Sequence, residues 1–228
     1  MKNIFFTCEV GKREGKYYAA KNPNAPIVLV LHPHPLHGGT MNNKIVYKLF
    51  HTFVNNGFSA LRFNFRGVGK SHGVFDHGVG ELIDATIALD WLQNNNPDAT
   101  HYWIAGFSFG AWIGAQIAMR RPEIKDFILV GPPANSYDFS FLYPCPVSGC
   151  IIQGSNDTIV PEQHVAKLVE QISSQSNIKI HYNVVNKADH FFTGDRLEEM
   201  GVIADKYIKS KLGAEQINVL TKSKKNIS

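Results

Sequence analysis

The 228-residue sequence has no long hydrophobic run and little charge. Its longest uninterrupted apolar stretch is residues 27–31. A membrane-spanning helix needs roughly 20 such residues, so we expect no membrane span. Charged residues make up 18% and hydrophobic residues 44% of the chain, which excludes a disordered, collagen-like or coiled-coil protein. The length suffices for one sizeable core, and the sequence therefore predicts a single globular domain.

Cysteine is also scarce. Cys8, Cys145 and Cys150 are an odd number of thiols without C-x-x-C spacing, so the sequence indicates neither a disulfide framework nor a zinc knuckle. The N-terminal residues lack the apolar stretch of roughly 7 to 15 residues and the small-residue cleavage site of a secretory signal. We therefore expect reduced thiols and a cytoplasmic protein.

The excess of basic over acidic residues, a net charge of +4, lies at one end of the chain. Residues 206–228 hold six of the 23 basic residues and one of the 19 acidic ones, which leaves the rest close to neutral. A near-neutral body predicts no nucleic-acid partner. Helical periodicity fades after residue 212, so we expect an ordered domain of residues 1–212 and a disordered basic tail of residues 213–228.

From residue 27 onward, short apolar runs alternate with longer segments of helical period. The expected strands are residues 27–32, 59–63, 102–106, 127–130, 150–154 and 179–185. The expected helices are residues 43–55, 79–94, 110–120, 161–173 and 195–212. Residues 4–20 predict an antiparallel pair of edge strands around a turn at 11–15. Together these elements predict an α/β fold, a mostly parallel, doubly wound sheet of about eight strands with helices on both faces.

The segment Gly106-Phe107-Ser108-Phe109-Gly110 matches the pattern G-x-S-x-G between an expected strand and an expected helix. In such a turn the serine is held in a strained conformation, and the glycines on either side let strand and helix approach closely. An ordinary glycine-rich turn has the same pattern. Ser108 is therefore a candidate nucleophile, which requires a base and a carboxylate from elsewhere in the chain.

Asp157 and His190 follow two later expected strands. In a doubly wound sheet, the residues after the parallel strands gather at one edge. The order Ser, Asp, His is that of α/β-hydrolases rather than of chymotrypsin or subtilisin. Each residue alone also fits a turn or a surface loop. Together with Ser108 they predict a catalytic triad in which His190 is the base and Asp157 orients it.

Over about residues 4–212 the chain resembles a small, lid-less bacterial α/β-hydrolase of the dienelactone-hydrolase-like, esterase-like group. The resemblance rests on His32-Pro33-His34-Pro35, Gly38-Gly39-Thr40-Met41, Phe63-Asn64-Phe65-Arg66-Gly67-Val68-Gly69, the segment from Gly106 to Gly110, and Asp189-His190-Phe191-Phe192. Dienelactone hydrolase itself uses a cysteine nucleophile, whereas this chain has Ser108. The resemblance therefore implies the hydrolase fold and an esterase-like activity that depends on serine.

An oxyanion hole takes the N–H of the residue after the nucleophile, here Phe109, and an N–H from the loop after the first parallel strand. Pro33 and Pro35 have no N–H, so the sequence predicts His34 as the second donor. His32, His34 and His37 are close enough in sequence to suggest a metal site, but no carboxylate or cysteine accompanies them. We expect neither metal nor cofactor, and the imidazoles of His34 and His37 are candidates for lining the substrate pocket.

The segment Gly67-Val68-Gly69-Lys70-Ser71 ends like a phosphate-binding P-loop. The first glycine of that motif would fall on Asn64, and a turn rather than a helix is expected after Ser71. We therefore expect a glycine-bent loop beside the site. Arg66 is expected in an ion pair with Asp84 or Glu81 rather than in substrate binding.

Only residues 131–148 separate two neighbouring expected strands at the place where related enzymes insert a lid. The site should therefore be open and shallow. We predict a serine hydrolase that cleaves small to medium acyl esters or thioesters through an acyl-enzyme, with a small-molecule acyl substrate as its partner. The alternatives are a peptidase or amidase with the same triad and a non-catalytic hydrolase-fold binding module. A homodimer also stays open, because no interface is identified.

Overall fold

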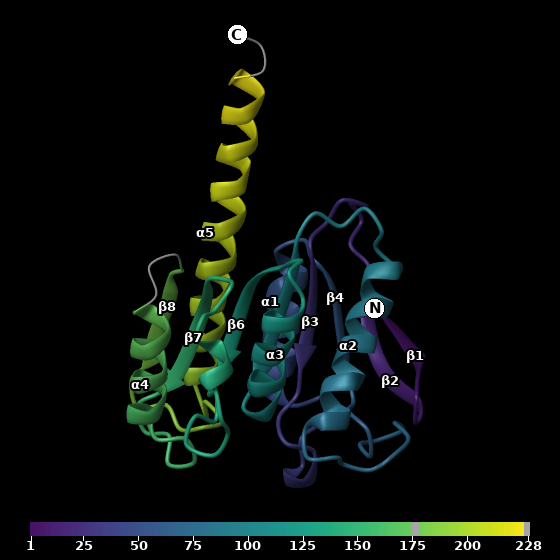
Figure 1. The fold of residues 1–228 in the computed structure, drawn as a ribbon, viewed down its shortest axis with the longest axis vertical. Helices are drawn as coiled ribbons and strands as arrows, with labels where there is room; N and C mark the ends of the chain where they lie inside the picture. The colour runs from purple at the N-terminus through teal and green to yellow at the C-terminus, as the bar shows by residue number, and fades with distance from the viewer. Residues whose placement is uncertain (175–177, 226–228) are drawn as a thin grey trace.

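The computed structural model describes residues 1–174 and 178–225, and side chains as far as residue 213. Its centre is an eight-stranded sheet in the order β1-β2-β4-β3-β5-β6-β7-β8 (Figure 1). The strands are β1 (Lys2–Cys8), β2 (Gly11–Tyr18), β3 (Ile27–Leu31), β4 (Ser59–Phe63), β5 (Tyr102–Phe107), β6 (Ile124–Val130), β7 (Gly149–Gly154) and β8 (Ile180–Val185). The two pairings of β2 are antiparallel and the others are parallel. The predicted fold class is confirmed.

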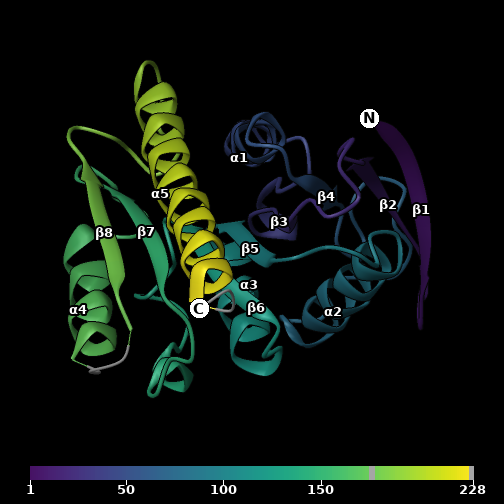
Figure 2. The ribbon, with the colours of Figure 1, turned by 90° about the horizontal axis from the view of Figure 1, so that it is seen from above.

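Helices cover both faces of this sheet (Figure 2). They are α1 (Lys44–Asn55), α2 (Val79–Asn94), α3 (Phe109–Arg120), α4 (Glu162–Ser173) and α5 (Arg196–Lys225), with short 3-10 turns η1 (Pro35–His37) and η2 (Ser140–Leu142). α1 and α5 pack on one face, whereas α2, α3 and α4 pack on the other. The parallel strands are thus buried on both sides.

The strand β3 shows why its sequence is a continuous apolar run. Ile27, Leu29 and Leu31 belong to the core under α2, α3 and α4. Val28 and Val30 alternate with them and belong to the core under α1 and α5. All five side chains are fully buried, because a strand between two helical layers has no face in water.

The N-terminal hairpin differs from its prediction. Its turn lies between Cys8 and Gly11, which are paired partners at the strand ends, and not at residues 11–15. Gly11 has a φ of +74°, which glycine adopts without strain. The chain therefore reverses at residues 9–10, before the predicted turn at residues 11–15. Of the two strands of this hairpin, β1 lies at the edge of the sheet and β2 does not, because β2 also pairs with β4.

The other predicted bounds agree with the structure to within one residue, except at the start of β6 and the end of α5. β6 begins at Ile124 and includes Asp126, a buried carboxylate that the periodicity did not place in a strand. The hydroxyl of Tyr207 donates to Asp126 at 2.5 Å, and the ammonium of Lys211 lies 2.9 Å away. Partners from α5 therefore allow a charge inside this strand.

The helix α5 continues to Lys225, so its predicted end at residue 212 is wrong and the segment 213–225 extends it. It projects beyond the rest of the domain (Figure 1). The segment contains no proline, and its one glycine, Gly213, costs a helix only about 1 kcal/mol relative to alanine. Residues 226–228 of the predicted tail lie outside the described residues.

Two further features of the described chain are the apolar length of its helices and the connection between β6 and β7. No helix in it is long and apolar enough to cross a membrane. The connection between β6 and β7, residues 131–148, holds only η2 and no inserted domain. The edge of the sheet beneath this connection is therefore left without a lid.

Candidate active site

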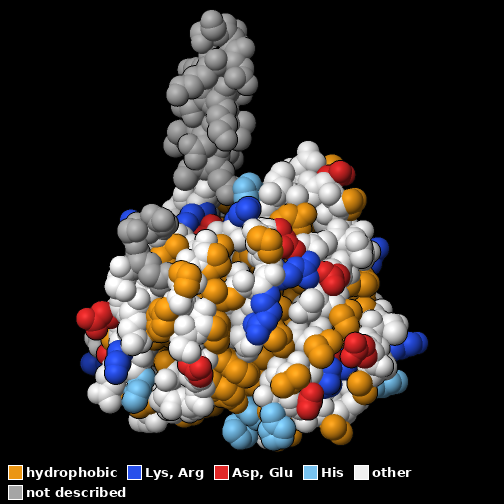
Figure 3. Space-filling view, in the orientation of Figure 1, with side chains coloured by type: hydrophobic (Ala, Val, Ile, Leu, Met, Phe, Trp, Pro, Cys, Tyr) orange, Lys and Arg blue, Asp and Glu red, His pale blue; other side chains and the backbone are white. Residues whose placement is uncertain are grey.

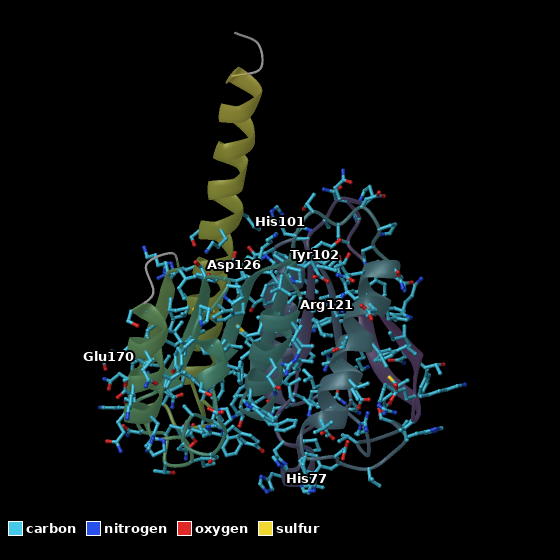
Figure 4. The ribbon with its side chains drawn as sticks, viewed as in Figure 1. His77, His101, Tyr102, Arg121, Asp126 and Glu170 are labelled. Carbon is cyan, nitrogen blue, oxygen red and sulfur yellow. The ribbon has the colours of Figure 1, made fainter. Side chains whose placement is uncertain are left out.

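The three predicted triad residues lie at one edge of the sheet. Ser108 directly follows β5, Asp157 lies three residues after β7, and His190 lies in the loop after β8. These strands are parallel neighbours through β6, so their carboxyl ends meet at the same side. In Figure 4 this side is the lower end, marked by His77, opposite Tyr102 at the start of β5.

The backbone at Ser108 is strained, with φ of +53° and ψ of −120°. A Cβ on Gly106 would lie 2.3 Å from the carbonyl oxygen of Gly110, and a Cβ on Gly110 would lie 2.4 Å from that of Leu31. Both contacts are impossible for a real side chain, so the turn requires glycine at both positions. The Ser108 N–H donates to the Val130 carbonyl at 2.9 Å and holds the turn against β6.

A chain of hydrogen bonds joins the three side chains. The Ser108 Oγ lies 3.1 Å from His190 Nε2, and His190 Nδ1 lies 2.7 Å from Asp157 Oδ2. A carboxylate accepts but does not donate, so Nδ1 carries a proton and Nε2 of the neutral ring can accept the Ser108 proton. This arrangement can turn a hydroxyl into a nucleophile.

The carboxylate of Asp157 is fully buried. Its Oδ1 accepts the N–H groups of Ile159 at 2.9 Å and Val160 at 2.7 Å, and its Oδ2 also accepts Gln153 Nε2 at 3.0 Å. These donors replace water around the charge and fix the direction of Oδ2. Our sequence analysis missed Gln153, although an amide inside an apolar strand is a signal for such a role.

The two residues predicted to supply the oxyanion hole have neighbouring side chains. Phe109 is the first residue of α3, and the first N–H groups of a helix have no acceptor within it. The rings of Phe109 and His34 are 5.2 Å apart between centroids. No hydrogen bond within the described part of the chain uses the His34 N–H. Both N–H groups are thus free to bind an external anion.

Aromatic and imidazole rings surround this position. His34 stacks on His37 with 4.3 Å between ring centroids and lies 4.7 Å from Phe75. Trp112 and Tyr137 also contact the ring of Phe109 and lie 4.4 Å from each other. Figure 3 shows histidine side chains gathered at this lower end of the molecule. The surface next to Ser108 is therefore formed by flat rings.

The pKa of His34 is lowered by burial and, in addition, by the neighbouring imidazoles of His37 and His77. Both effects disfavour a second proton on the ring. In the residues that the structure describes, no three histidine, cysteine or acidic side chains form a group that could hold a metal ion.

Arg66 binds Asp84, one of the two partners expected for it. Its Nη2 donates to Asp84 Oδ1 at 2.9 Å and its Nε to Oδ2 at 3.1 Å, and Arg13 also donates to Oδ1 at 2.8 Å. Glu81 instead accepts the backbone N–H groups of residues 76 and 78. These buried bonds hold the loop that carries Phe75 and His77, so Arg66 has a structural role.

The P-loop interpretation is also excluded by the structure. The hydroxyl of Ser71 donates to the Asn64 carbonyl at 2.6 Å and accepts the Glu14 N–H at 3.1 Å. The next helix, α2, begins only at Val79. A phosphate-binding loop needs a helix directly after this residue, and here the glycines bend an ordinary loop.

Comparison with known proteins places this fold in a family. Residues 19–144 match the family model of the X-Pro dipeptidyl-peptidases, the S15 family. The Rickettsia prowazekii protein RP471 is 57% identical over 196 residues, which are 84% of this chain and 82% of that protein.

Two solved bacterial structures are also similar. A putative α/β-hydrolase from Agrobacterium tumefaciens, ATU1826, is 50% identical with a TM-score of 0.91 and covers 94% of this chain and 98% of its own. XC6422 from Xanthomonas campestris, described as a serine hydrolase without a lid, is 30% identical with a TM-score of 0.81 and covers 92% of this chain and 94% of its own. The chain therefore belongs to the α/β-hydrolase family of serine hydrolases, and its residues 19–144 match the S15 family model.

Proposed function

We propose that this hydrolase cleaves small to medium acyl esters or thioesters, with Ser108 as the nucleophile and His190 as the general base. The observation that carries the proposal is the hydrogen-bonded chain from Ser108 through His190 to Asp157, with Ser108 in a strained turn. Asp157 holds His190 in the tautomer that accepts a proton. The N–H groups of His34 and Phe109 receive the negative charge of the tetrahedral intermediate.

The reaction follows from these roles. His190 takes the Ser108 proton while the oxygen attacks the carbonyl carbon, and the protonated ring then gives the proton to the leaving alcohol or thiol. Water, activated by the same imidazole, releases the acid and restores Ser108. Without a lid, the acyl chain lies against the open ring surface of Phe75, Trp112 and Tyr137, which suits short or flat groups better than long chains.

A peptidase is the second candidate, because the matching family model is that of X-Pro dipeptidyl-peptidases. That match covers Ser108 but ends before Asp157 and His190. A dipeptidyl-peptidase must also bind a free amino terminus, for which carboxylates are the natural partners. Asp76, an acidic side chain in the same loop as Phe75, is half exposed and lies 3.7 Å from the guanidinium of Arg66. We therefore favour esters over peptides.

Intact-mass measurement after exposure to a fluorophosphonate tests the nucleophile. We expect one adduct on wild type and none on Ser108→Ala or His190→Ala, provided that circular dichroism shows all three to be folded. A folded wild type without an adduct would contradict the proposal and favour a non-catalytic binding module.

Substrate series then separate the candidates. We expect turnover of p-nitrophenyl acetate and butyrate to exceed that of the palmitate ester and of dipeptidyl p-nitroanilides with proline at the second position. A steady rise of activity toward long chains would overturn the proposed size range. Faster cleavage of the X-Pro anilide than of the esters would establish the peptidase instead.

A further inference from the structure

His32 lies directly after β3 and is completely buried. Its Nδ1 is 2.6 Å from the carbonyl oxygen of Pro33, and its Nε2 is 3.0 Å from the backbone nitrogen of Phe65. The Phe65 N–H can only donate, so Nε2 must be the unprotonated nitrogen. The proton is therefore on Nδ1, which donates to the Pro33 carbonyl. The surrounding backbone defines a single tautomer.

This imidazole is also held neutral. Complete burial lowers the pKa of His32 from 6.5 to about 4, because a buried ring loses the water that would stabilise its charge. A proton on Nε2 would additionally face the Phe65 N–H, which is a donor. Around neutral pH, His32 Nδ1 thus stays the donor to the Pro33 carbonyl, and Nε2 stays the acceptor of the Phe65 N–H.

The bond to Pro33 determines where the next N–H points. The Pro33 carbonyl and the His34 N–H belong to one planar trans peptide, in which C=O and N–H point in opposite directions. Fixing the oxygen toward His32 therefore fixes the His34 N–H away from it. Gly39 packs against the same oxygen, since a Cβ there would lie 2.1 Å from it. The peptide plane is clamped by an imidazole and a glycine.

We propose that His32 is a positioning residue of the oxyanion hole. Its neutral, Nδ1-protonated ring holds the Pro33–His34 peptide so that the His34 N–H faces the substrate carbonyl at Ser108. The ring links this loop to the loop after β4 through Phe65. The inference rests on the proposed function, because it assigns His32 a task only if the His34 N–H binds the oxyanion.

Two substitutions at His32 each remove one of its two hydrogen bonds and keep the other. In His32→Asn the side-chain N–H₂ lies near the position of Nδ1 and keeps the donor to Pro33, while the bond to Phe65 is lost. In His32→Gln the amide reaches the position of Nε2 and its oxygen accepts the Phe65 N–H, while the donor to Pro33 is lost. Each variant thus leaves one buried backbone group unpaired, and we expect similar losses of melting temperature.

Catalysis should separate the variants. We measure kcat and KM for p-nitrophenyl butyrate, and inhibition by butylboronic acid, whose tetrahedral adduct on serine resembles the intermediate. In His32→Gln we expect kcat to fall about ten- to a hundredfold with little change in KM, since oxyanion donors act mainly in the transition state. Inhibition by the boronic acid should weaken by a similar factor. His32→Asn should keep kcat within about threefold of wild type.

Nitrogen NMR of imidazole-labelled protein gives a readout that does not depend on turnover. We expect His32 to be protonated at Nδ1 only. Protonation at Nε2, or equal kcat in the two variants with an active wild type, would overturn the role of His32 alone. Absence of any turnover by folded wild type would overturn the proposed function together with this inference.

Discussion

Two backbone segments meet at the site and are held by different means. The turn at Ser108 is fixed by its own glycines, because Gly106 and Gly110 remove the atoms that would keep strand and helix apart. The loop after β3 is fixed by the side chain of His32, which bonds to its neighbour Pro33 and to the distant Phe65. The first is a local steric constraint, whereas the second depends on the pairing of β3 with β4.

The difference shows how catalytic groups can be placed accurately in an open site. The nucleophile needs a strained conformation, which only close packing of strand and helix can enforce. The oxyanion loop needs a direction, and a buried, neutral hydrogen-bonding group supplies it. Gly110 joins the two segments, because its missing Cβ lets α3 touch the end of β3. Disturbing one segment at a time separates their contributions.

The largest effect is expected from Asp157→Asn. The amide can present an N–H₂ group to His190 and favour the wrong tautomer, so we expect kcat to fall by about 10⁴-fold with the fold intact. Steady-state kinetics with p-nitrophenyl butyrate and circular dichroism check this. A variant with native spectrum and near-native kcat would remove Asp157 from the triad.

Gly106→Ala disturbs the turn directly. Its Cβ would lie 2.3 Å from the Gly110 oxygen, so either strand or helix must move, with an expected loss of about 3 kcal/mol of stability. Urea unfolding measures the loss, and fluorophosphonate labelling of the folded fraction should be strongly slowed. Gly213→Ala is the control, since the structure has nothing within 4 Å of its Cβ position.

The dependence of the unfolding free energy on pH tests the loop after β3, because His32 is neutral in the folded protein. Its pKa is about 4 in the folded protein against 6.5 as the ordinary value, so the unfolded chain binds the proton first. Stability should therefore fall as pH falls from 6.5 to 4, by about 3 kcal/mol from this residue. His34, His51 and His181 are shifted in the same direction.

The contribution of His32 is isolated as the difference between wild type and His32→Asn in urea unfolding at pH 7 and pH 4.5. The variant should be less stable than wild type at pH 7, and this gap should narrow in acid. A gap that stays constant across this range would show that the burial of His32 does not depress its pKa.

Gly39→Ala is expected to have the smallest effect of these four changes. Its Cβ would meet the Pro33 oxygen, so the peptide must rotate or shift away from His32. We expect kcat to fall about tenfold with a smaller change in KM, because the His34 N–H is displaced rather than removed. If Gly39→Ala leaves kcat unchanged, the loop tolerates more movement than the clamp implies.

Much of the fold was readable from the chain. Strand and helix positions followed from the alternation of short apolar runs with helical periodicity. Because β3 and its neighbours are buried on both faces, their sequences are continuous apolar runs. The turn of the first hairpin and the start of β6 were not. The turn depends on the register between β1 and β2, and Asp126 stays in β6 because Tyr207 and Lys211 reach it from α5.

The order of Ser108, Asp157 and His190 after three strands, and the prolines around His34, were sufficient to name the candidate site, because parallel topology brings strand ends together. The supporting residues could not be named in the same way. Gln153 and His32 act through hydrogen bonds to groups that only folding brings near, and Gly39 acts through a carbonyl oxygen that only the folded loop places beside it. The sequence by itself determined the fold class and which residues meet at this edge, while the tertiary structure decided how they are held, since a hydrogen bond has direction and a sequence pattern has none.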